Sequence, residues 1–169
     1  VMNEEMNKAL TPLIAGGTGS MSASLEMPPT LPDRYEAGTP NLPGIMGLGV
    51  ALRYLQEVGL DALHRREMAL TERFLSGLRG NEHIRIPGPA DAKGRVGVIS
   101  VDCLRQDNAE VAFQLEEQYG ILTRCGLHCA PLAHKTLGTY PEGTVRFSIG
   151  YTTTEEEVDA AIRAIHDLA

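Results

Sequence analysis

The sequence has few cysteines, no long apolar stretch and no cluster of basic residues. Its 169 residues include 3 Cys, and its 15 Lys and Arg are outnumbered by 22 Asp and Glu, which gives a net charge of -7. Scattered cations on an acidic chain argue against a nucleic-acid partner. The cysteine count is odd and the chain is too long to resemble a disulfide scaffold, so we expect reduced thiols.

Signals for membranes or export are also missing from the sequence. No apolar run approaches the length of a membrane span, and no basic and then apolar leader is found. We therefore expect no membrane partner and a cytoplasmic location. The content of 43% hydrophobic and 22% charged residues suits one globular domain with an irregular lead-in.

Chemically active side chains gather in residues 120–131, which read GILTRCGLHCAP. The apolar and β-branched residues 121–123 predict a short buried strand that ends in a loop. Cys129 lies on this loop, with Arg124 and His128 nearby in sequence. Nearby positive charge or a base favours the thiolate, which is the nucleophilic form of cysteine. Cys129 is therefore a candidate nucleophile.

The same side chains are also compatible with a structural role or with metal binding. A free cysteine is often only a small buried hydrophobe, and we expect this of Cys103. Cys125 is the rival nucleophile, four residues before Cys129. These three thiols and His128 could instead hold zinc in a small metal-binding module. The adjacent His128 and Cys129 make that spacing poor, because both cannot easily point inward.

Hydrophobic periodicity predicts an α/β fold with helices on at least one face of a sheet. We expect Asp61, Asn108 and Thr154 to cap helices, the last through a capping box with Glu157. The proline-rich segment 20–43 excludes long regular elements. The expected helices cover residues 44–58, 61–80 and 109–118 and a last stretch from 154, and the expected strands cover residues 84–86, 96–101, 121–123 and 144–149.

Separated segments resemble, in the same order, the cysteine desulfurase and selenocysteine lyase family, a class V branch of the fold-type I pyridoxal-phosphate enzymes. They are residues 12–19 (PLIAGGTG), 34–41 (RYEAGTPN), 124–131 (RCGLHCAP) and 143–148 (GTVRFS). Several blocks in order are far more specific than any one of them. The chain starts deep inside the family's pattern, so we expect it to be the C-terminal portion of a longer protein.

The resemblance implies a fold and a domain organisation. Residues 1–43 would be an irregular lead-in that carries the cofactor-phosphate segment at the end of the large domain. Residues 44–169 would be the small C-terminal α/β domain, with helices packed on one mainly antiparallel or mixed sheet.

The resemblance also implies an activity, a cofactor and partners. Such enzymes use pyridoxal 5'-phosphate to remove sulfur from L-cysteine, or selenium from selenocysteine, and leave alanine and a persulfide, here on Cys129. Gly38 and Thr39 would reach the cofactor phosphate of the neighbouring subunit in a homodimer, with Gly17 and Thr18 in a loop beside the site. A sulfur-acceptor protein is a further expected partner. Another class V aminotransferase or lyase is the alternative.

Substrate binding is assigned by the same resemblance. Arg146 would clamp the substrate α-carboxylate, because its planar guanidinium suits bidentate capture. Arg124 and His128 are further candidates for substrate binding. Arg124 would be either a second positive charge near the thiolate or part of a structural pair, and His128 would either assist proton transfer or be simply solvated. An ordinary surface ion pair, for example with Glu142, is the alternative for Arg146.

One feature of the family is absent from the sequence. The lysine that forms a Schiff base with the cofactor lies upstream of the matched segments in the family, whereas this chain has Lys8, Lys93 and Lys135 alone. Lys135 follows the cysteine, where the family has an ordinary helix, so we do not assign it as the cofactor lysine. We therefore expect this chain by itself to be inactive.

Overall fold

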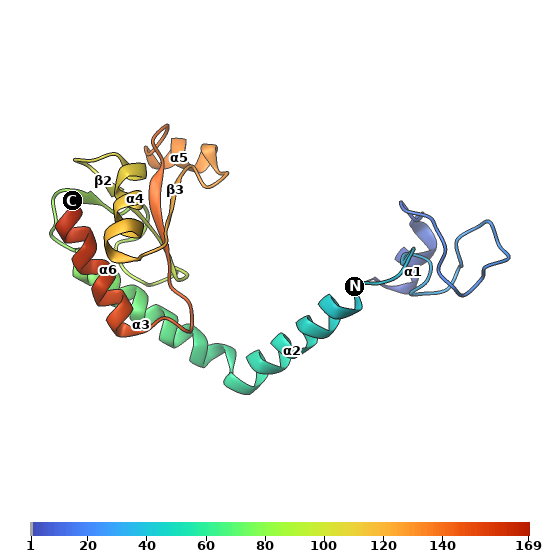
Figure 1. Ribbon diagram of the computed structural model, residues 1–169. Helices are drawn as coiled ribbons and strands as arrows, with labels where there is room; N and C mark the ends of the chain where they lie inside the picture. The colour runs from blue at the N-terminus through green and yellow to red at the C-terminus, as the bar shows by residue number, and fades with distance from the viewer. Residues whose placement is uncertain (1) are drawn as a thin grey trace. The chain divides into compact units, whose positions relative to one another are not determined.

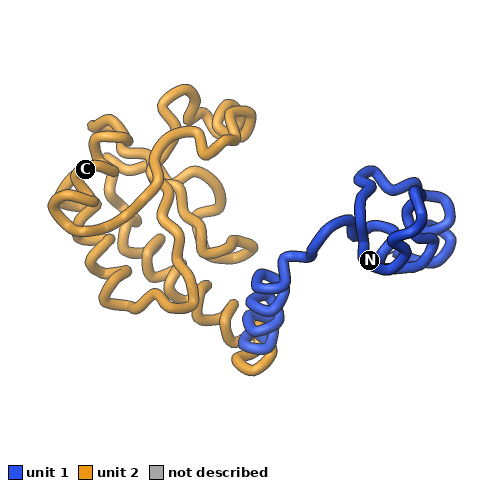
Figure 2. The backbone as a smooth tube through the Cα atoms, turned by 45° about the vertical axis from the view of Figure 1, so that its right-hand side comes forward, with its two compact units in different colours: residues 1–55 blue, residues 56–169 orange. Residues whose placement is uncertain are grey.

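The computed structural model describes residues 2–169. They form two compact units, which comprise residues 2–55 and 56–169 (Figure 2). The division falls within helix α2 (Leu42–Val58). The predicted domains, 1–43 and 44–169, refer to the two domains of a whole enzyme and stay a prediction.

Unit 1 is largely irregular, as its prolines lead one to expect. It begins with the short helix α1 (Glu4–Ala9), where the side chain of Asn3 accepts a hydrogen bond from the N–H of Met6. Among its described residues Pro28 alone is buried. The 17 residues of α2, the helix predicted at 44–58, include no buried residue. Unit 1 therefore has no hydrophobic core of its own among the described residues.

Unit 2 is built on a four-stranded sheet of order β1-β2-β4-β3 in which all neighbours are antiparallel. The predicted α/β fold with a mainly antiparallel sheet is confirmed. The strands are β1 (Ile84–Arg85), β2 (Val98–Cys103), β3 (Arg124–Gly126) and β4 (Thr144–Ser148). Cys103 is buried at the end of β2, as its expected structural role requires.

Helices cover one face of this sheet. They are α3 (Leu60–Leu78), α4 (Asn108–Tyr119) and α6 (Glu155–Leu168), which pack with the strands around one core (Figure 1). The phenyl rings of Phe74 and Phe147 lie 5.0 Å apart there. The capping box predicted for α6 is confirmed.

The two faces of the sheet differ in chemistry. Successive side chains of a strand point to opposite faces, so the buried Val145 and Phe147 of β4 face the helices and Arg146 faces away from them. Ser100 pairs with Arg146 on one side and Arg124 pairs with it on the other. Residues directly opposite in a ladder share a face, so both arginines lie on the face opposite the core.

The strand predicted at residues 121–123 is wrong. Helix α4 ends at Gly120 in the left-handed conformation, and the next three residues lead the chain to the sheet before β3 begins at Arg124. Leu122 is 79% exposed. The β propensity of Ile121 and Thr123 is overridden by the pairing with β4, which begins at Arg124.

Two predicted helix caps are also wrong. Helix α3 begins after Gly59, which has a φ of 85°, and Asp61 lies in its first turn. The N-cap of α4 is Asp107, whose carboxylate accepts the N–H groups of Ala109 and Glu110. Asn108 instead turns its side chain into the interior of unit 2. Asp and Asn are both good caps. Because Asn108 is buried, the neighbouring Asp107 caps the helix.

Candidate active site

Cys129 lies in a strained turn between β3 and helix α5 (Pro131–Leu137). His128 and Cys129 have φ values of 50° and 60°, in the left-handed region that L residues with side chains rarely adopt. The N–H of Ala130 closes the turn by donating to the carbonyl of Leu127, at 2.8 Å. Such strain costs about 1–3 kcal/mol per residue and persists where the surrounding structure holds it.

The Cys129 thiol lies beside a cation. Its Sγ atom is 3.5 Å from Nη2 of Arg124, and the residue is exposed. A guanidinium at this distance stabilises a thiolate by charge and hydrogen bonding. The structure therefore brings together Cys129 and Arg124, two of the residues assigned from the sequence.

The other two cysteines face different surroundings. Cys125 pairs with Val145, which is completely buried on the core face, so Cys125 points away from the face that carries Arg124. Burial, with a smaller effect from Asp102, raises the pKa of the Cys103 thiol to about 11. These positions favour Cys129 over both as a nucleophile.

Arg146 and Arg124 are direct cross-strand neighbours. Like charges in this arrangement repel, and neither guanidinium forms an ion pair with any residue among 2–169. The suggested pair with Glu142 thus does not occur there. Nε of Arg146 is buried and has no hydrogen-bond partner within the described chain. Two unneutralised cations and an unused N–H donor fit an anionic ligand such as a carboxylate.

His128 completes this group of side chains. Its Nε2 atom lies 3.2 Å from the hydroxyl of Thr144, and its ring centroid lies 5.6 Å from that of His134. Burial lowers its pKa below the ordinary value, and the nearby Arg146, His134 and Arg124 lower it further. Nδ1 is buried without a partner among residues 2–169. Near neutral pH the imidazole is therefore uncharged and keeps one ring nitrogen for a ligand.

The segments expected to hold the cofactor phosphate lie side by side in unit 1. The N–H of Gly38 donates to the carbonyl of Gly17 at 2.8 Å, so the two glycine-containing segments meet. The Thr18 hydroxyl lies 2.9 Å from that of Ser20, and Thr39 is exposed. A cavity of about 260 Å³ adjoins Gly38. Two hydroxyls on adjoining segments suit a phosphate, although the Gly38 N–H is already used.

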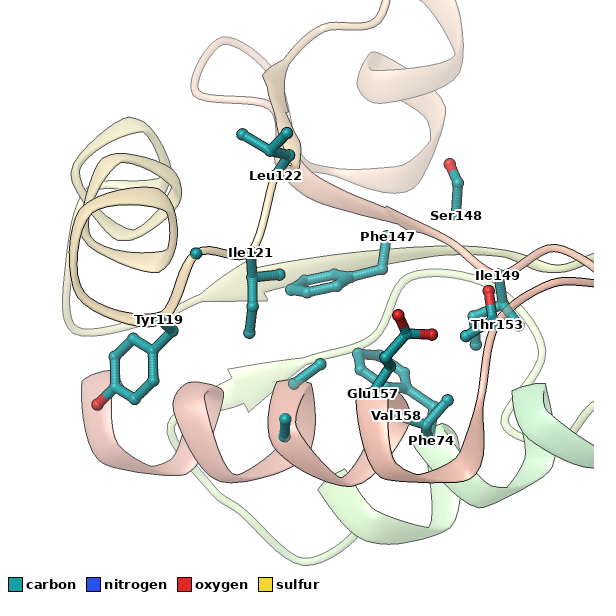
Figure 3. A pocket seen from close by; sticks show the side chains of 13 residues that line it. Phe74, Tyr119, Ile121, Leu122, Phe147, Ser148, Ile149, Thr153, Glu157 and Val158 are labelled. Atoms are coloured by element: carbon teal, nitrogen blue, oxygen red, sulfur yellow. The ribbon is translucent and has the colours of Figure 1, made fainter.

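A larger cavity of unit 2 lies away from these residues. Its volume is about 420 Å³, and Figure 3 shows the side chains of Ile121, Phe147 and Glu157 gathered around it. Phe147 is on the core face, opposite Arg146. The cavity therefore does not belong to the site around Cys129.

The remaining expectations concern Lys135, metals and membranes. Lys135 is exposed on α5, and its ammonium lies 4.9 Å from the ring centroid of Tyr140. Among residues 2–169 no three His, Cys, Asp or Glu side chains are arranged to hold a metal ion, so the zinc alternative gains no support. The helices of the same residues are too short or too polar to cross a bilayer.

Two residues of the site were not found from the sequence. Thr144 hydrogen bonds to His128, and Asn108 donates to the carbonyl of Gly143, at 3.2 Å, immediately before Thr144. Thr144 was visible only as a strand residue, and Asn108 as a cap. The available signal was that Thr144 and Asn108 are polar residues in segments that pack against the core, because a buried polar side chain needs a hydrogen-bond partner.

Comparison with known proteins identifies the family. The sequence profile of the family Aminotransferase class-V matches residues 1–161. The chain belongs to this family. The resemblance to cysteine desulfurases is also confirmed, because relatives with that name match 95% and 97% of this chain.

Two curated relatives illustrate the similarity. A probable cysteine desulfurase of Methanothermobacter thermautotrophicus is 32% identical over 163 residues, which covers 95% of this chain and 40% of the relative. A cysteine desulfurase of Klebsiella pneumoniae is 37% identical over 172 residues, with 97% and 40% covered. The chain thus spans about 40% of the length of these relatives.

Solved structures agree with the class-V assignment. The apo structure of a cysteine desulfurase from Thermococcus onnurineus superposes with a TM-score of 0.84 at 31% identity, covering 99% of this chain and 41% of that one. A cysteine desulfurase from Escherichia coli shares the fold, with a TM-score of 0.79 at 24% identity, covering 98% of this chain and 40% of that chain.

Proposed function

We propose that this chain is the C-terminal part of a pyridoxal-phosphate-dependent cysteine desulfurase. The enzyme removes sulfur from L-cysteine, or selenium from selenocysteine, and releases alanine. The observation that carries the proposal is the exposed thiol of Cys129 beside Arg124, on the sheet face where Arg146 offers an unused buried donor. The similarity to cysteine desulfurases supports the choice among class-V reactions.

Each side chain of the site has a role in this chemistry. Arg146 binds the α-carboxylate of the substrate through paired N–H donors, which orients the substrate. The Cys129 thiolate, stabilised by Arg124, attacks the substrate sulfur and forms a persulfide. The electrons of the broken carbon–sulfur bond stay with the substrate, which takes up a proton and becomes alanine. Uncharged His128 is a local acceptor for a proton.

Pyridoxal phosphate, when bound, supplies the electron sink that weakens the bond to sulfur. In unit 1 the hydroxyls of Thr18 and Thr39 suit its phosphate, and Gly17 and Gly38 give the backbone room to approach it. The Schiff-base lysine would come from a part of the enzyme upstream of these residues, so this chain alone is inactive.

The proposal extends to partners and location. The full-length enzyme is a cytoplasmic homodimer in which Thr39 serves the site of the neighbouring subunit. Exposure of Cys129 would let a sulfur-acceptor protein reach the persulfide directly.

The proposal is tested with the full-length protein, pyridoxal phosphate and L-cysteine. With a reductant present we expect alanine and sulfide in equal amounts. Without the reductant, mass spectrometry should find one additional sulfur atom on the peptide that contains Cys129. Formation of a keto acid in place of alanine would instead identify a class-V aminotransferase.

Matched serine variants test the nucleophile. Cys129→Ser should lower sulfide release by about a thousandfold or more, because a nucleophile is lost. Cys125→Ser should retain activity, because that thiol faces the core side. An inactive Cys125→Ser beside an active Cys129→Ser would reverse the assignment.

A further inference from the structure

The turn that carries Cys129 needs support from outside itself. Its two left-handed residues, His128 and Cys129, are both non-glycine. A backbone in this conformation persists only where its surroundings hold it. The hydrogen bond from Ala130 to Leu127 closes the turn, but it does not fix the turn to the sheet.

Strand β4 supplies an anchor to the sheet. Thr144 lies opposite Gly126 in the ladder and is 1% exposed. Its hydroxyl is 3.2 Å from Nε2 of His128, the first of the two strained residues. A side chain fixed by the sheet is thus bonded to the turn itself.

Contacts of the neighbouring Gly143 in turn fix the position of Thr144. The carbonyl of Gly143 accepts a hydrogen bond from Asn108, at 3.2 Å, and Asn108 is 4% exposed. A Cβ atom on Gly143 would collide with the backbone of Gly126. The start of β4 and the end of β3 are therefore packed in direct contact, which limits movement of Thr144.

We infer that Thr144 is a positioning residue which, through His128, holds the left-handed turn so that the Cys129 thiol stays beside Arg124. Its importance to the reaction rests on the proposed function, since Cys129 is the nucleophile there. The placement of the turn itself does not depend on that function.

The reactivity of the Cys129 thiol depends on where the turn holds it, because most of the surrounding charged and titratable groups lie on other elements. Arg124 on β3 and Arg146 on β4 are the cations, and His128 in the turn and His134 on α5 are the neighbouring titratable groups. If the turn relaxes, the Sγ atom of Cys129 loses its 3.5 Å contact with Nη2 of Arg124, and the reaction with an alkylating reagent slows.

The test is the rate at which iodoacetamide alkylates Cys129 in the full-length protein, measured at pH 7 in a Cys125→Ser background. Thr144→Val keeps the shape of the side chain and removes the hydroxyl. We expect the rate to fall by about fivefold, which corresponds to about 1 kcal/mol. Thr144→Ser should restore the parent rate, and Thr144→Ala repeats the test if the valine variant does not fold.

A matched control separates positioning from a general loss of stability. Thr139 is 3% exposed, and its hydroxyl lies 2.7 Å from Nδ1 of His134. Thr139→Val therefore removes the same kind of buried bond one residue farther from the turn, since His134 lies between Thr139 and the ring of His128. It should lower the alkylation rate much less than Thr144→Val. Equal losses in the Thr139 and Thr144 variants would overturn the inference.

A double-mutant cycle tests whether Thr144 acts through His128. His128→Ala should lower the alkylation rate as Thr144→Val does, and the combination should lower it no further, because both remove one contact. Additive losses, or a Thr144→Val variant with the parent rate, would reject the positioning role. Alkylation needs no cofactor turnover, so this result stands apart from the success or failure of the desulfurase assay.

Discussion

The two units differ in the packing that surrounds their candidate site residues. In unit 2 the strands that carry Arg124 and Arg146 pair with each other, and their opposite face is packed by helices. In unit 1 Gly38 and Thr39 lie on an irregular segment, where Pro28 is the one buried residue described. The thiol site thus rests on a packed core. The segment that carries Thr39 is instead tied to the start of unit 1 by hydrogen bonds, which run from Gly38 to the carbonyl of Gly17 and from Tyr35 to the carbonyl of Asn7.

This difference indicates how the candidate residues of each unit are held in place. Catalytic geometry requires side chains held within a narrow range, which a packed sheet provides. A segment without a core of its own gains order from the surfaces it contacts in the assembled enzyme. An exposed Thr39 on a segment of this kind is available to the site of a neighbouring subunit, as proposed.

The largest expected effect tests the phosphate segment. Thr39→Asp places a carboxylate against the cofactor phosphate, so we expect loss of cofactor binding and of activity, while Thr39→Ser should remain active. Inactive Thr39→Asp and inactive Cys129→Ser proteins are then unfolded together, refolded and assayed as mixed dimers. Restored activity in the mixture supports a site shared between subunits.

The contrary result of that mixing is equally clear. If mixed dimers are shown to form and no activity returns, Thr39 acts within its own subunit. Thr39 and Cys129 of one chain would then serve the same site, and the two units would differ only in how their residues are held in place.

A smaller effect is expected inside unit 2, where the two paired arginines should have separable roles. Arg146→Lys removes the bidentate clamp, and we expect kcat/KM for L-cysteine to fall by about 10- to 100-fold. Arg124→Lys should mainly slow alkylation of Cys129, because its guanidinium contacts the thiol. If both variants change both measurements equally, the arginines act as one cationic patch.

The sequence was sufficient for the fold, whereas its assignment of the site residues stays a prediction, and particular residues show why. Helical periodicity and the capping box of Thr154 were local signals, and the structure confirms them. The start of β3 at Arg124 was not predictable locally, since it is set by pairing with Arg146. The roles of Thr144 and Asn108 depend on contacts between distant segments, which no local pattern records.

The smallest expected effect is on stability and follows from the titration of His128. Its pKa is lowered in the folded protein, mainly by burial, so between that pKa and the ordinary value of about 6.5 the unfolded chain binds more protons. The contribution to stability is therefore present above about pH 6.5 and is lost as the pH falls through the lowered pKa. The carboxyl groups with lowered pKa values, Glu72 and Asp159, respond in a more acidic range.

The midpoint of thermal unfolding of the full-length protein should consequently drop between pH 7.5 and 5.5. This drop should be smaller in His128→Gln, and His64→Gln, which changes an exposed histidine, is the control. An equal drop in both variants would mean that the interior of unit 2 accommodates the charged imidazole, and the neutral proton acceptor proposed at this position would have no basis.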